Sequence, residues 1–189
     1  MSEWNVSAVT SLYRLIVQIS CKATFNEAIG AWDVSSVTTM EGMFGDAHAF
    51  NQRLDWDVSS VTNMEYMFNS AYDFNQPLEW DVSSVTSMTF MFYDAHSFNQ
   101  PLIWDTNAVT NMQFMFYNAR AFNQRLDWHV FAVTNMLVRA RPHRHAICAC
   151  TPTPPAPGQH AGASARCHAR APHSSCSTGT MRCRTATRR

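Results

Sequence analysis

The chain has 189 residues, of which 46% are hydrophobic, and its 14 basic and 14 acidic side chains give a formal net charge of zero. This length leaves room for one domain with a sizeable core. We find no apolar segment long enough to span a membrane, and no glycine-rich phosphate loop, zinc-protease motif or nucleophile elbow. We therefore expect a protein that is not an enzyme, needs no cofactor and has no small-molecule substrate.

The net charge of zero hides two parts of different composition. Residues 1–136 carry 14 acidic and five basic side chains, a net charge of −9, whereas residues 137–189 carry nine arginines and no acid. Five of the six cysteines also lie in residues 137–189. The composition therefore divides the chain near residue 137.

Residues 1–136 repeat with a fixed period. The steps between successive tryptophans are 28, 24, 24, 24 and 24 residues, and these tryptophans are Trp4, Trp32, Trp56, Trp80, Trp104 and Trp128. Such a period predicts stacked units that share one core, because a single short unit cannot bury enough apolar surface to fold alone. The first unit, residues 4–31, has four extra residues and is expected to be irregular. Its short apolar run, with Glu3 before it, argues against a signal peptide.

In each regular unit, one segment is predicted to be a short helix. In residues 62–71, apolar side chains recur at the spacing of one helix face, and these are Met64, Met67, Phe68 and Ala71. Thr62 and Glu65 are spaced as an N-cap and its capping box, and Tyr66 takes the staple position that fixes how the chain enters the helix. Equivalent helices are expected to begin at Thr38, Thr86 and Thr110.

The remaining segments of the unit are predicted to be a strand and a turn. Residues 74–78 are typical of one short strand of a parallel sheet, with Pro77 near its end because proline has no N–H for the ladder. Residues 80–84, Trp-Asp-Val-Ser-Ser, are typical of a turn in which a side chain accepts from an N–H two residues on.

The sixth unit begins at Trp128 and stops at Met136, inside its predicted helix. Residues 137–189 have no apolar periodicity and include a proline-rich stretch typical of disordered chain. We predict one domain over residues 1–136, with about five units, the first irregular and the sixth truncated. A disordered tail rich in arginine, proline and cysteine follows over residues 137–189. An alternative interpretation is that this tail is a gene-model artefact.

One motif returns nearly intact through residues 32–127, and it reads Phe-Asn-Gln-Pro-Leu-x-Trp-Asp-Val-Ser-Ser-Val-Thr-x-Met-x-x-Met-Phe. It resembles the repeat of BspA-like leucine-rich-repeat surface proteins and mycoplasma surface lipoproteins, which is also common in algae and protists. The resemblance covers about residues 1–136. It implies a leucine-rich-repeat-like solenoid and, in the bacterial members, a surface role in adhesion or interaction. It therefore favours a surface or extracellular location, although we find no export signal.

An aspartate follows the tryptophan in four units, at Asp33, Asp57, Asp81 and Asp105. If these carboxylates stack about 4.8 Å apart, the strand spacing, they repel one another. Bound calcium would relieve that repulsion, so these four residues are a candidate metal site. The alternative, which we favour, is that each aspartate caps its own turn and points to water.

Three further columns of equivalent residues are expected to be structural. The methionines at 40, 43, 64, 67, 88, 91, 112 and 115 are spaced to face inward beside phenylalanines, which favours core packing over a promiscuous methionine-rich groove. The tryptophans and the asparagines at 26, 51, 75, 99 and 123 are expected to form ladders, with the asparagine amides bonding neighbouring units.

Exposed positions that vary between units are where a protein ligand would be recognised. Tyrosine and arginine are favoured at protein interfaces, and histidine occupies two of these variable positions. The candidates for ligand binding are Tyr72, Tyr93, Tyr117, His48, His96 and Arg120.

The tail has residue types that bind metal or nucleic acid, but not their patterns. Its candidate metal ligands are Cys148, Cys150, Cys167, His168, Cys176 and Cys183, and their spacing matches neither a paired Cys-x-x-Cys site nor a Cys2His2 site. Nine arginines without aromatic residues could attract nucleic acid. Contact between the tail and the acidic part of the same chain is an equal alternative.

We therefore expect an α/β solenoid. It is a leucine-rich-repeat-like, right-handed stack of units of about 24 residues, with short parallel strands on one side and short helices on the other. The predicted role is a non-enzymatic scaffold for protein–protein or cell-surface recognition. Two alternatives remain, a truncated fragment of a longer repeat protein with no role of its own, and binding of nucleic acid or metal through the tail.

Overall fold

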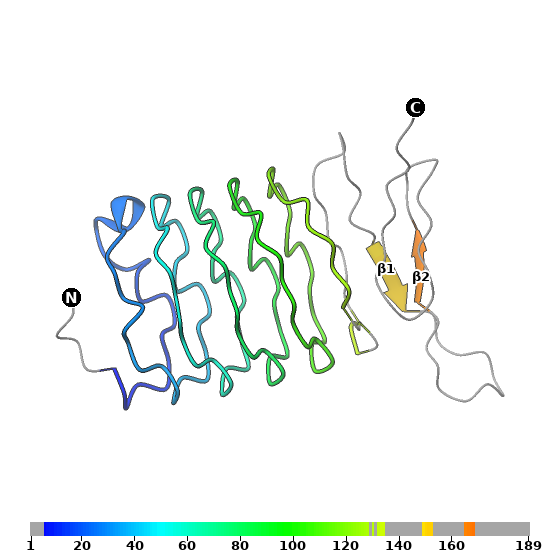
Figure 1. The fold of residues 1–189 in the computed structure, drawn as a ribbon, viewed down its shortest axis with the longest axis horizontal. Helices are drawn as coiled ribbons and strands as arrows, with labels where there is room; N and C mark the ends of the chain where they lie inside the picture. Colours follow the sequence, from blue (N-terminus) through cyan, green and yellow to red (C-terminus); the bar gives the residue numbers. More distant parts are fainter. Residues whose placement is uncertain (1–5, 129, 131, 135–148, 153–164, 169–189) are drawn as a thin grey trace.

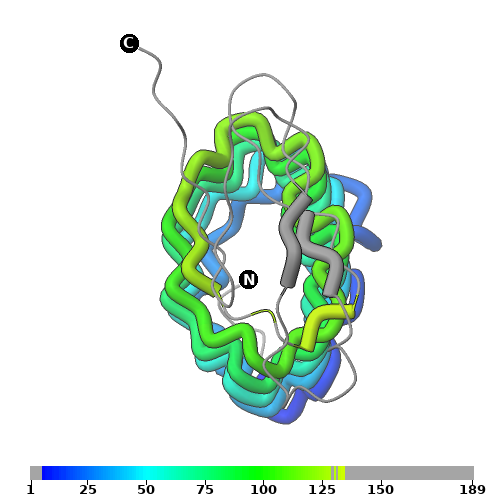
Figure 2. Tube along the Cα trace, turned by 90° about the vertical axis from the view of Figure 1, so that its right-hand side faces the viewer, coloured from blue at the N-terminus to red at the C-terminus, as the bar shows by residue number. Residues whose placement is uncertain are grey.

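The computed structural model describes residues 6–128, 130, 132–134, 149–152 and 165–168. From residue 6 to residue 128 the chain winds into coils that lie side by side along one axis (Figure 1). Seen along that axis, the coils superpose in one oval outline (Figure 2). We number them coil 1 (6–31), coil 2 (32–55), coil 3 (56–79), coil 4 (80–103) and coil 5 (104–127).

Regular secondary structure is sparse among the described residues. It comprises a 3-10 helix, η1 (Lys22–Thr24), and two strands, β1 (Ala149–Pro152) and β2 (Ala165–His168), that pair antiparallel with Cys150 opposite Cys167. The strand pair lies within the segment predicted to be disordered. The rest of that prediction falls on residues 137–148, 153–164 and 169–189, which lie outside the described residues.

Neighbouring coils pair through backbone hydrogen bonds between equivalent residues. Isolated parallel bridges join Ser11 to Thr39, Thr39 to Asn63, Asn63 to Ser87 and Ser87 to Asn111. After each bridge, every second N–H donates to a carbonyl of the next coil. In coil 3 these bonds are 2.8–3.0 Å long, and they run from Met64, Tyr66, Phe68 and Ser70 to Ser87, Thr89, Met91 and Tyr93.

The prediction of a helix over residues 62–71 is wrong, and η1 is the only helical element among the described residues. Tight turns replace the helix: the N–H of Met67 donates to the carbonyl of Met64 and the N–H of Ala71 to that of Phe68. Tyr66 has a φ of 55°, a left-handed conformation that an α-helix cannot contain. The N–H groups that a helix would use internally are therefore free to pair with the next coil.

The predicted cap residue Thr62 has a different partner from the one expected. Its N–H and its hydroxyl both donate to the carbonyl of Thr38 in the preceding coil, at 2.8 and 3.2 Å. Equivalent threonines repeat this pair of bonds, with Thr86 on Thr62 and Thr110 on Thr86. Equivalent segments from Thr38, Thr86 and Thr110 also lack an α-helix. The regularly spaced threonines therefore join neighbouring coils and do not start helices.

The predicted strand is also absent, whereas the predicted turn is present. Residues 74–78 are assigned no strand, and the N–H of Asn75 donates to a side chain of coil 2 instead of a backbone carbonyl. In the turn, the N–H of Ser83 donates to Asp81 Oδ1 at 3.0 Å, and the N–H of Val85 donates to the carbonyl of Val82 at 2.9 Å.

The interior of the coils is filled by methionine and phenylalanine, as predicted. The core methionines of coils 2 to 5 are 0% exposed. Phe44, Phe68, Phe92 and Phe116 stack one above another with ring centroids 5.4–5.5 Å apart. A second file of phenylalanines, at 50, 74, 98 and 122, repeats at 5.9 Å and lies 4.1 Å from the first. Stacked rings of this kind contribute about 0.5–1.5 kcal/mol per pair beyond their burial.

Four of the tryptophans stack in two pairs of the expected ladder, and Trp4 lies outside the described residues. The rings of Trp56 and Trp80 are 6.5 Å apart and inclined by 4°, and those of Trp104 and Trp128 are 5.9 Å apart and inclined by 6°. The indole N–H groups of this ladder also reach the preceding coil, as Trp80 Nε1 does when it donates to the carbonyl of Leu54 at 3.0 Å. The buried indoles therefore fix the register between coils as well as filling the core.

Coil 1 accommodates most of its extra residues at η1. Thr38 bonds to Thr10, 28 residues earlier, whereas Asn51 bonds to Asn26, 25 residues earlier. Three of the four extra residues therefore lie between positions 10 and 26, the interval that contains η1. The insertion leaves the pairing of coil 1 with coil 2 intact on both sides.

Candidate interaction surface

Three aromatic residues at the same place in successive coils form a half-exposed file. Tyr66, Phe90 and Phe114 stack with ring centroids 4.8 and 5.1 Å apart. Tyr66 is 37% exposed, and the other two are of intermediate exposure. The methionine that follows each of these residues, Met67, Met91 or Met115, is by contrast 0% exposed.

A second file stands beside the first. The rings of Tyr93 and Tyr117 stack 5.0 Å apart, and Tyr117 is 37% exposed. Tyr93 lies 5.5 Å from Phe90 at 55°, and Tyr117 lies 6.0 Å from Phe114 at 80°. These contacts join five rings into one surface, which we call the aromatic face: Tyr66, Phe90, Tyr93, Phe114 and Tyr117.

The backbone beneath this face is strained. Tyr66, Phe90 and Phe114 have φ values of 55°, 57° and 56°, in the left-handed region that costs a non-glycine residue about 1–2 kcal/mol. The equivalent residue of coil 2 is Gly42, with a φ of 61°, and glycine adopts this conformation without that cost. Stacking of the rings along the file contributes about 0.5–1.5 kcal/mol per pair, which offsets part of this strain.

Carboxylates lie next to the aromatic face on both sides. Glu41 accepts from Asn63 Nδ2 at 3.1 Å, and Glu65 accepts from Ser87 Oγ at 2.5 Å. Burial raises the pKa of Tyr66, with further contributions from the charges of Glu65 and Glu41. Burial also raises the pKa of Tyr93, to which the charge of Asp94 adds. The raised pKa values favour the neutral phenol form of Tyr66 and Tyr93.

Histidine and tyrosine rings form a further, mixed file next to Asp94. The ring of Tyr72 stacks between His48 and His96, with centroids 4.3 and 4.7 Å away and inclinations of 12° and 9°. All three side chains are of intermediate exposure. The imidazole rings are thus held in fixed positions at the surface.

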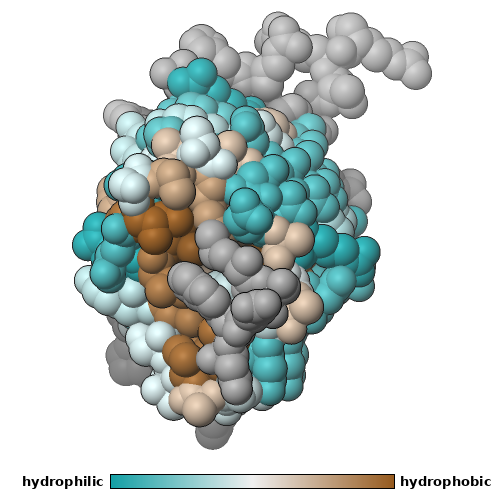
Figure 3. Space-filling view, turned by 90° about the vertical axis from the view of Figure 1, so that its left-hand side faces the viewer, coloured by the Kyte–Doolittle hydropathy of each residue, from teal (hydrophilic) through white to brown (hydrophobic). Residues whose placement is uncertain are grey.

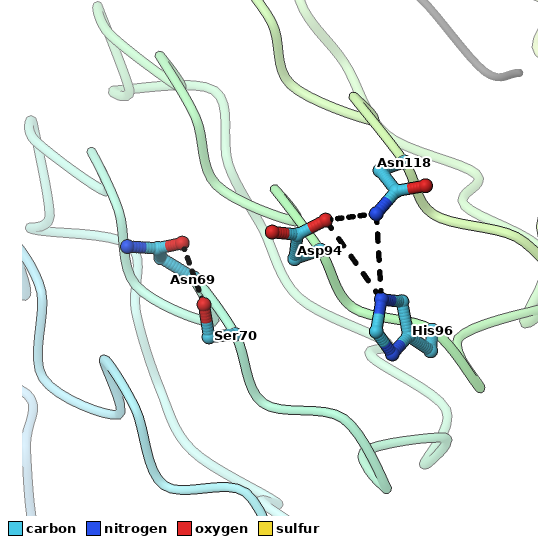
Figure 4. Close-up of polar contacts among 5 residues, drawn as sticks. All are labelled: Asn69, Ser70, Asp94, His96 and Asn118. Atoms are coloured by element: carbon cyan, nitrogen blue, oxygen red, sulfur yellow. Dashed lines mark hydrogen bonds and ion pairs between the residues drawn. The ribbon is translucent and has the colours of Figure 1, made fainter.

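Polar contacts join His96 of this file to Asp94 and Asn118, which follow Tyr93 and Tyr117 in the sequence (Figure 4). Asn118 Nδ2 donates to Asp94 Oδ1 and lies 3.5 Å from His96 Nε2, which is itself 3.8 Å from Asp94 Oδ1. In the preceding coil, Ser70 Oγ donates to Asn69 Oδ1 at 3.2 Å. Asp94 and Asn118 share the left-handed backbone of Ser70, a conformation that short polar residues tolerate. The cluster holds the carboxylate of Asp94 next to the imidazole of His96, and the charge of Asp94 acts on Tyr93.

The structure divides the six predicted ligand-binding residues into two groups. Tyr93 and Tyr117 belong to the aromatic face, whereas His48, Tyr72 and His96 form the mixed file. Arg120 is exposed, at the position of coil 5 that corresponds to His96.

Sequence reasoning missed the other three residues of the aromatic face, because the predicted helix assigned Tyr66 to a structural staple. The recurrence of an aromatic residue at 66, 90 and 114 was the available signal.

The four aspartates that follow tryptophan cap their own turns. Asp33, Asp57, Asp81 and Asp105 accept the N–H two residues on, at 3.0–3.1 Å. Hydrogen bonds from the serine hydroxyl, and then from its N–H, lower the pKa of Asp33, Asp57 and Asp81. Within the described part of the chain, no group of three or more His, Cys, Asp or Glu side chains is placed to hold a metal ion. The calcium site stays a prediction.

Half of the candidate metal ligands of the tail fall on residues that the structure does not describe. Cys148, Cys176 and Cys183 lie outside the described residues, and Cys150, Cys167 and His168 belong to β1 and β2. The remaining cysteine, Cys21, is an exposed free thiol in coil 1. Across the described residues, no helix is both long enough and apolar enough to cross a membrane.

Comparison with known proteins finds one family. The family described as "Mycoplasma protein of unknown function, DUF285" matches residues 1–79 and 54–141, which together span the repeated part of the chain. No curated protein matches the chain, and no solved structure matches it.

Proposed function

The chain belongs to the family of Mycoplasma proteins of unknown function DUF285, and we propose that it is a non-enzymatic repeat scaffold that recognises another protein through the aromatic face. We also propose that its coils form a right-handed solenoid of the leucine-rich-repeat-like class, and that it acts at a surface, as the resemblance to BspA-like proteins implies. Pairing of equivalent residues from coil to coil supports the proposal of a solenoid.

The observation that carries the functional proposal is the continuity of the aromatic face. Five rings on coils 3 to 5 lie in contact with one another, and each remains partly exposed. Tyrosine is among the residues most enriched in binding hot spots, because its ring buries apolar area while its hydroxyl keeps a hydrogen-bond partner. The rings are also fixed by stacking, so binding would cost little side-chain entropy.

A specific observation favours the rival interpretation, a fragment of a longer array with no role alone. Hydrophobic residues gather at the N-terminal end of the coils (Figure 3), where Val9, Leu15 and Ile19 are only partly buried. An exposed apolar end promotes association. A monodisperse monomer in size-exclusion chromatography would favour the scaffold, and concentration-dependent aggregation would favour the fragment.

Photo-cross-linking in the native cells tests the scaffold function. p-Benzoylphenylalanine replaces Tyr117 on the aromatic face or, as a control, Ile103, which is 94% exposed and is not one of the five residues of that face. The expected result is one protein cross-linked from position 117 and absent from position 103. Cross-links of the same protein from both positions would contradict a specific face.

The cross-linked protein is then purified and its affinity measured against two matched variants. Tyr117→Glu should weaken binding at least tenfold, because it places a charge among the rings, whereas Ile103→Glu should change affinity less than about twofold. Near-ultraviolet circular dichroism checks that both variants keep the packed tryptophans. Equal affinities for Tyr117→Glu and the unchanged chain would overturn the proposal.

A further inference from the structure

We propose that the arginine-rich segment of the same chain, residues 137–189, docks on the aromatic face and its neighbouring carboxylates. This intramolecular contact shares its surface with the proposed function but does not require it, since it could cover the face whether or not another protein binds there. It would make recognition conditional, because a partner would have to displace the segment.

Charge complementarity is the first support for this occupant. Residues 1–136 have a net charge of −9, and residues 137–189 have nine arginines and no acidic residue. Being on one chain, the two parts meet at an effective concentration of the order of millimolar. Opposite charges so tethered attract each other over a distance of about one Debye length, about 8 Å at physiological ionic strength.

Glu41 and Glu65, beside the aromatic face, are among the carboxylates of the described residues that have no lysine or arginine partner. Glu41 and Glu65 accept hydrogen bonds from neutral partners, Asn63 and Ser87. Among the described residues, the ion pairs of lysine and arginine involve other acids: Lys22 with Asp46, Arg53 with Asp55 and Arg125 with Asp127. The aspartates after the tryptophans are engaged in their own turns. Uncompensated charge thus remains where the rings are exposed.

An arginine already lies in line with Tyr66, Phe90 and Phe114, at the coil 1 end of their file. Arg14 is the coil 1 equivalent of Gly42, and its Cγ is 3.0 Å from the place that a Cβ on Gly42 would occupy. The arginine stem therefore covers the glycine in line with Tyr66. Arginine suits such a place because its apolar stem can cover ring edges while its planar guanidinium bonds a carboxylate.

The segment is long enough to reach the face. Four coil spacings of about 4.8 Å separate the sixth unit from coil 2, a distance of about 20 Å. Ten residues of extended chain span about 33 Å, so residues 135–144, which contain Arg139, Arg141 and Arg144, can pass along the face.

Intramolecular photo-cross-linking of the purified full chain tests the proposal. p-Benzoylphenylalanine replaces Phe90, at the centre of the face, and a control protein carries it at Ile103. After illumination of dilute protein, mass spectrometry should find peptides from residues 137–189 linked to position 90 and at least fivefold less to position 103. Mixing unlabelled chain with ¹⁵N-labelled chain separates links within one molecule from links between two.

Two charge-matched variants then locate the contact. Glu41→Gln with Glu65→Gln should lower the yield from position 90 at least threefold, and Glu79→Gln with Asp81→Asn should leave it unchanged. Near-ultraviolet circular dichroism confirms folding. No link to residues 137–189, links only between labelled and unlabelled chains, or equal loss in both variants would each overturn the proposal. None of these results bears on binding of a separate protein in cells, which is tested from position 117.

Discussion

Asn75 donates its backbone N–H to the side-chain Oδ1 of Asn51, one coil earlier, at 3.0 Å. Asn75 Oδ1 in turn accepts from the N–H of Asn99 at 2.9 Å and from Gln100 Nε2 at 3.1 Å. The three inner asparagines of the ladder, Asn51, Asn75 and Asn99, therefore each donate to the coil before and accept from the coil after. Side chains here take the place of a strand ladder, which explains why the segment pairs coils without being a strand.

Removing one amide from this ladder should destabilise the whole stack. Asn75→Ala leaves the N–H of Asn99 without its acceptor, and an unsatisfied group of this kind costs about 1–3 kcal/mol. Asn75→Asp keeps an oxygen at the same place and is the matched control. Urea unfolding should show a larger loss for alanine than for aspartate. Equal losses would mean that the hydrogen bond from Asn99 does not contribute.

The indole hydrogen bond makes a similar prediction for the tryptophan ladder. Trp80→Phe removes the donor to the buried carbonyl of Leu54 and reduces the stacking on Trp56. We expect a loss of about 2–4 kcal/mol in the free energy of unfolding. The exposed control Ile103→Val should change it by less than about 0.5 kcal/mol. A loss at Trp80 no larger than that of the control would contradict a structural role for Nε1.

A glycine substitution distinguishes the observed turns from the predicted helix. At Phe90, with a φ of 57°, Phe90→Gly removes the ring and relieves the left-handed strain, whereas Phe90→Ala removes the ring and keeps the strain. Phe90→Gly should therefore be the more stable of the two by about 1 kcal/mol. In a helix the order would be reversed by a similar amount. Chemical denaturation of the two variants measures the difference directly.

The sequence predicted which residues are buried better than it predicted how the backbone runs. The spacing of Met64, Met67, Phe68 and Ala71 places all four inside, as expected, but two successive turns satisfy that spacing as well as a helix does. What separates them is the φ of Tyr66, and no pattern of apolar residues reports it. Gly42, at the same place in coil 2, was the only residue type that hinted at a left-handed conformation.

Only part of the candidate site was predictable from the sequence, because a repeated residue pattern reports burial and exposure but not the path of the backbone. Columns with one residue type in every unit, such as the asparagines and the tryptophans, could be predicted to form ladders. The aromatic face mixes residue types in each column, and its files follow from turns that were not foreseen. Tyr93 and Tyr117 were found because they are exposed and variable, whereas Phe90 and Phe114 were assigned to no role.

The capping aspartates predict a specific dependence on acid. The pKa of Asp81 is lowered by hydrogen bonds from Ser83, so its contribution to stability is complete above the ordinary aspartate pKa of about 3.9. That contribution is lost as the pH falls through the lowered pKa. Carbon-detected NMR titration should show the pKa of Asp81 rising in Ser83→Ala and unchanged in Ser84→Ala. An Asp81 pKa at or above the ordinary value in the unchanged chain would contradict the cap.

Calcium should leave the stability of the protein unchanged. Each carboxylate of the column is already bonded to its own turn, as in Asp57 with the N–H of Ser59 at 3.0 Å. The melting temperature should therefore be the same in millimolar calcium and in chelator. A ligand present at 100 times its dissociation constant would stabilise the fold by about 2.7 kcal/mol. A clear rise in melting temperature with calcium would support the metal site in place of the caps.

The pairing of turns from coil to coil is the basis of the aromatic face, and one NMR measurement tests it. The N–H of Phe90 donates to the carbonyl of Gln113 at 2.9 Å, and the carbonyl of Thr86 is taken by the N–H of Thr110. A scalar coupling through the hydrogen bond should therefore connect Phe90 N to the carbonyl carbon of Gln113. A coupling from Phe90 N to the carbonyl carbon of Thr86, four residues earlier, would mean that the segment is a helix and that the face does not exist.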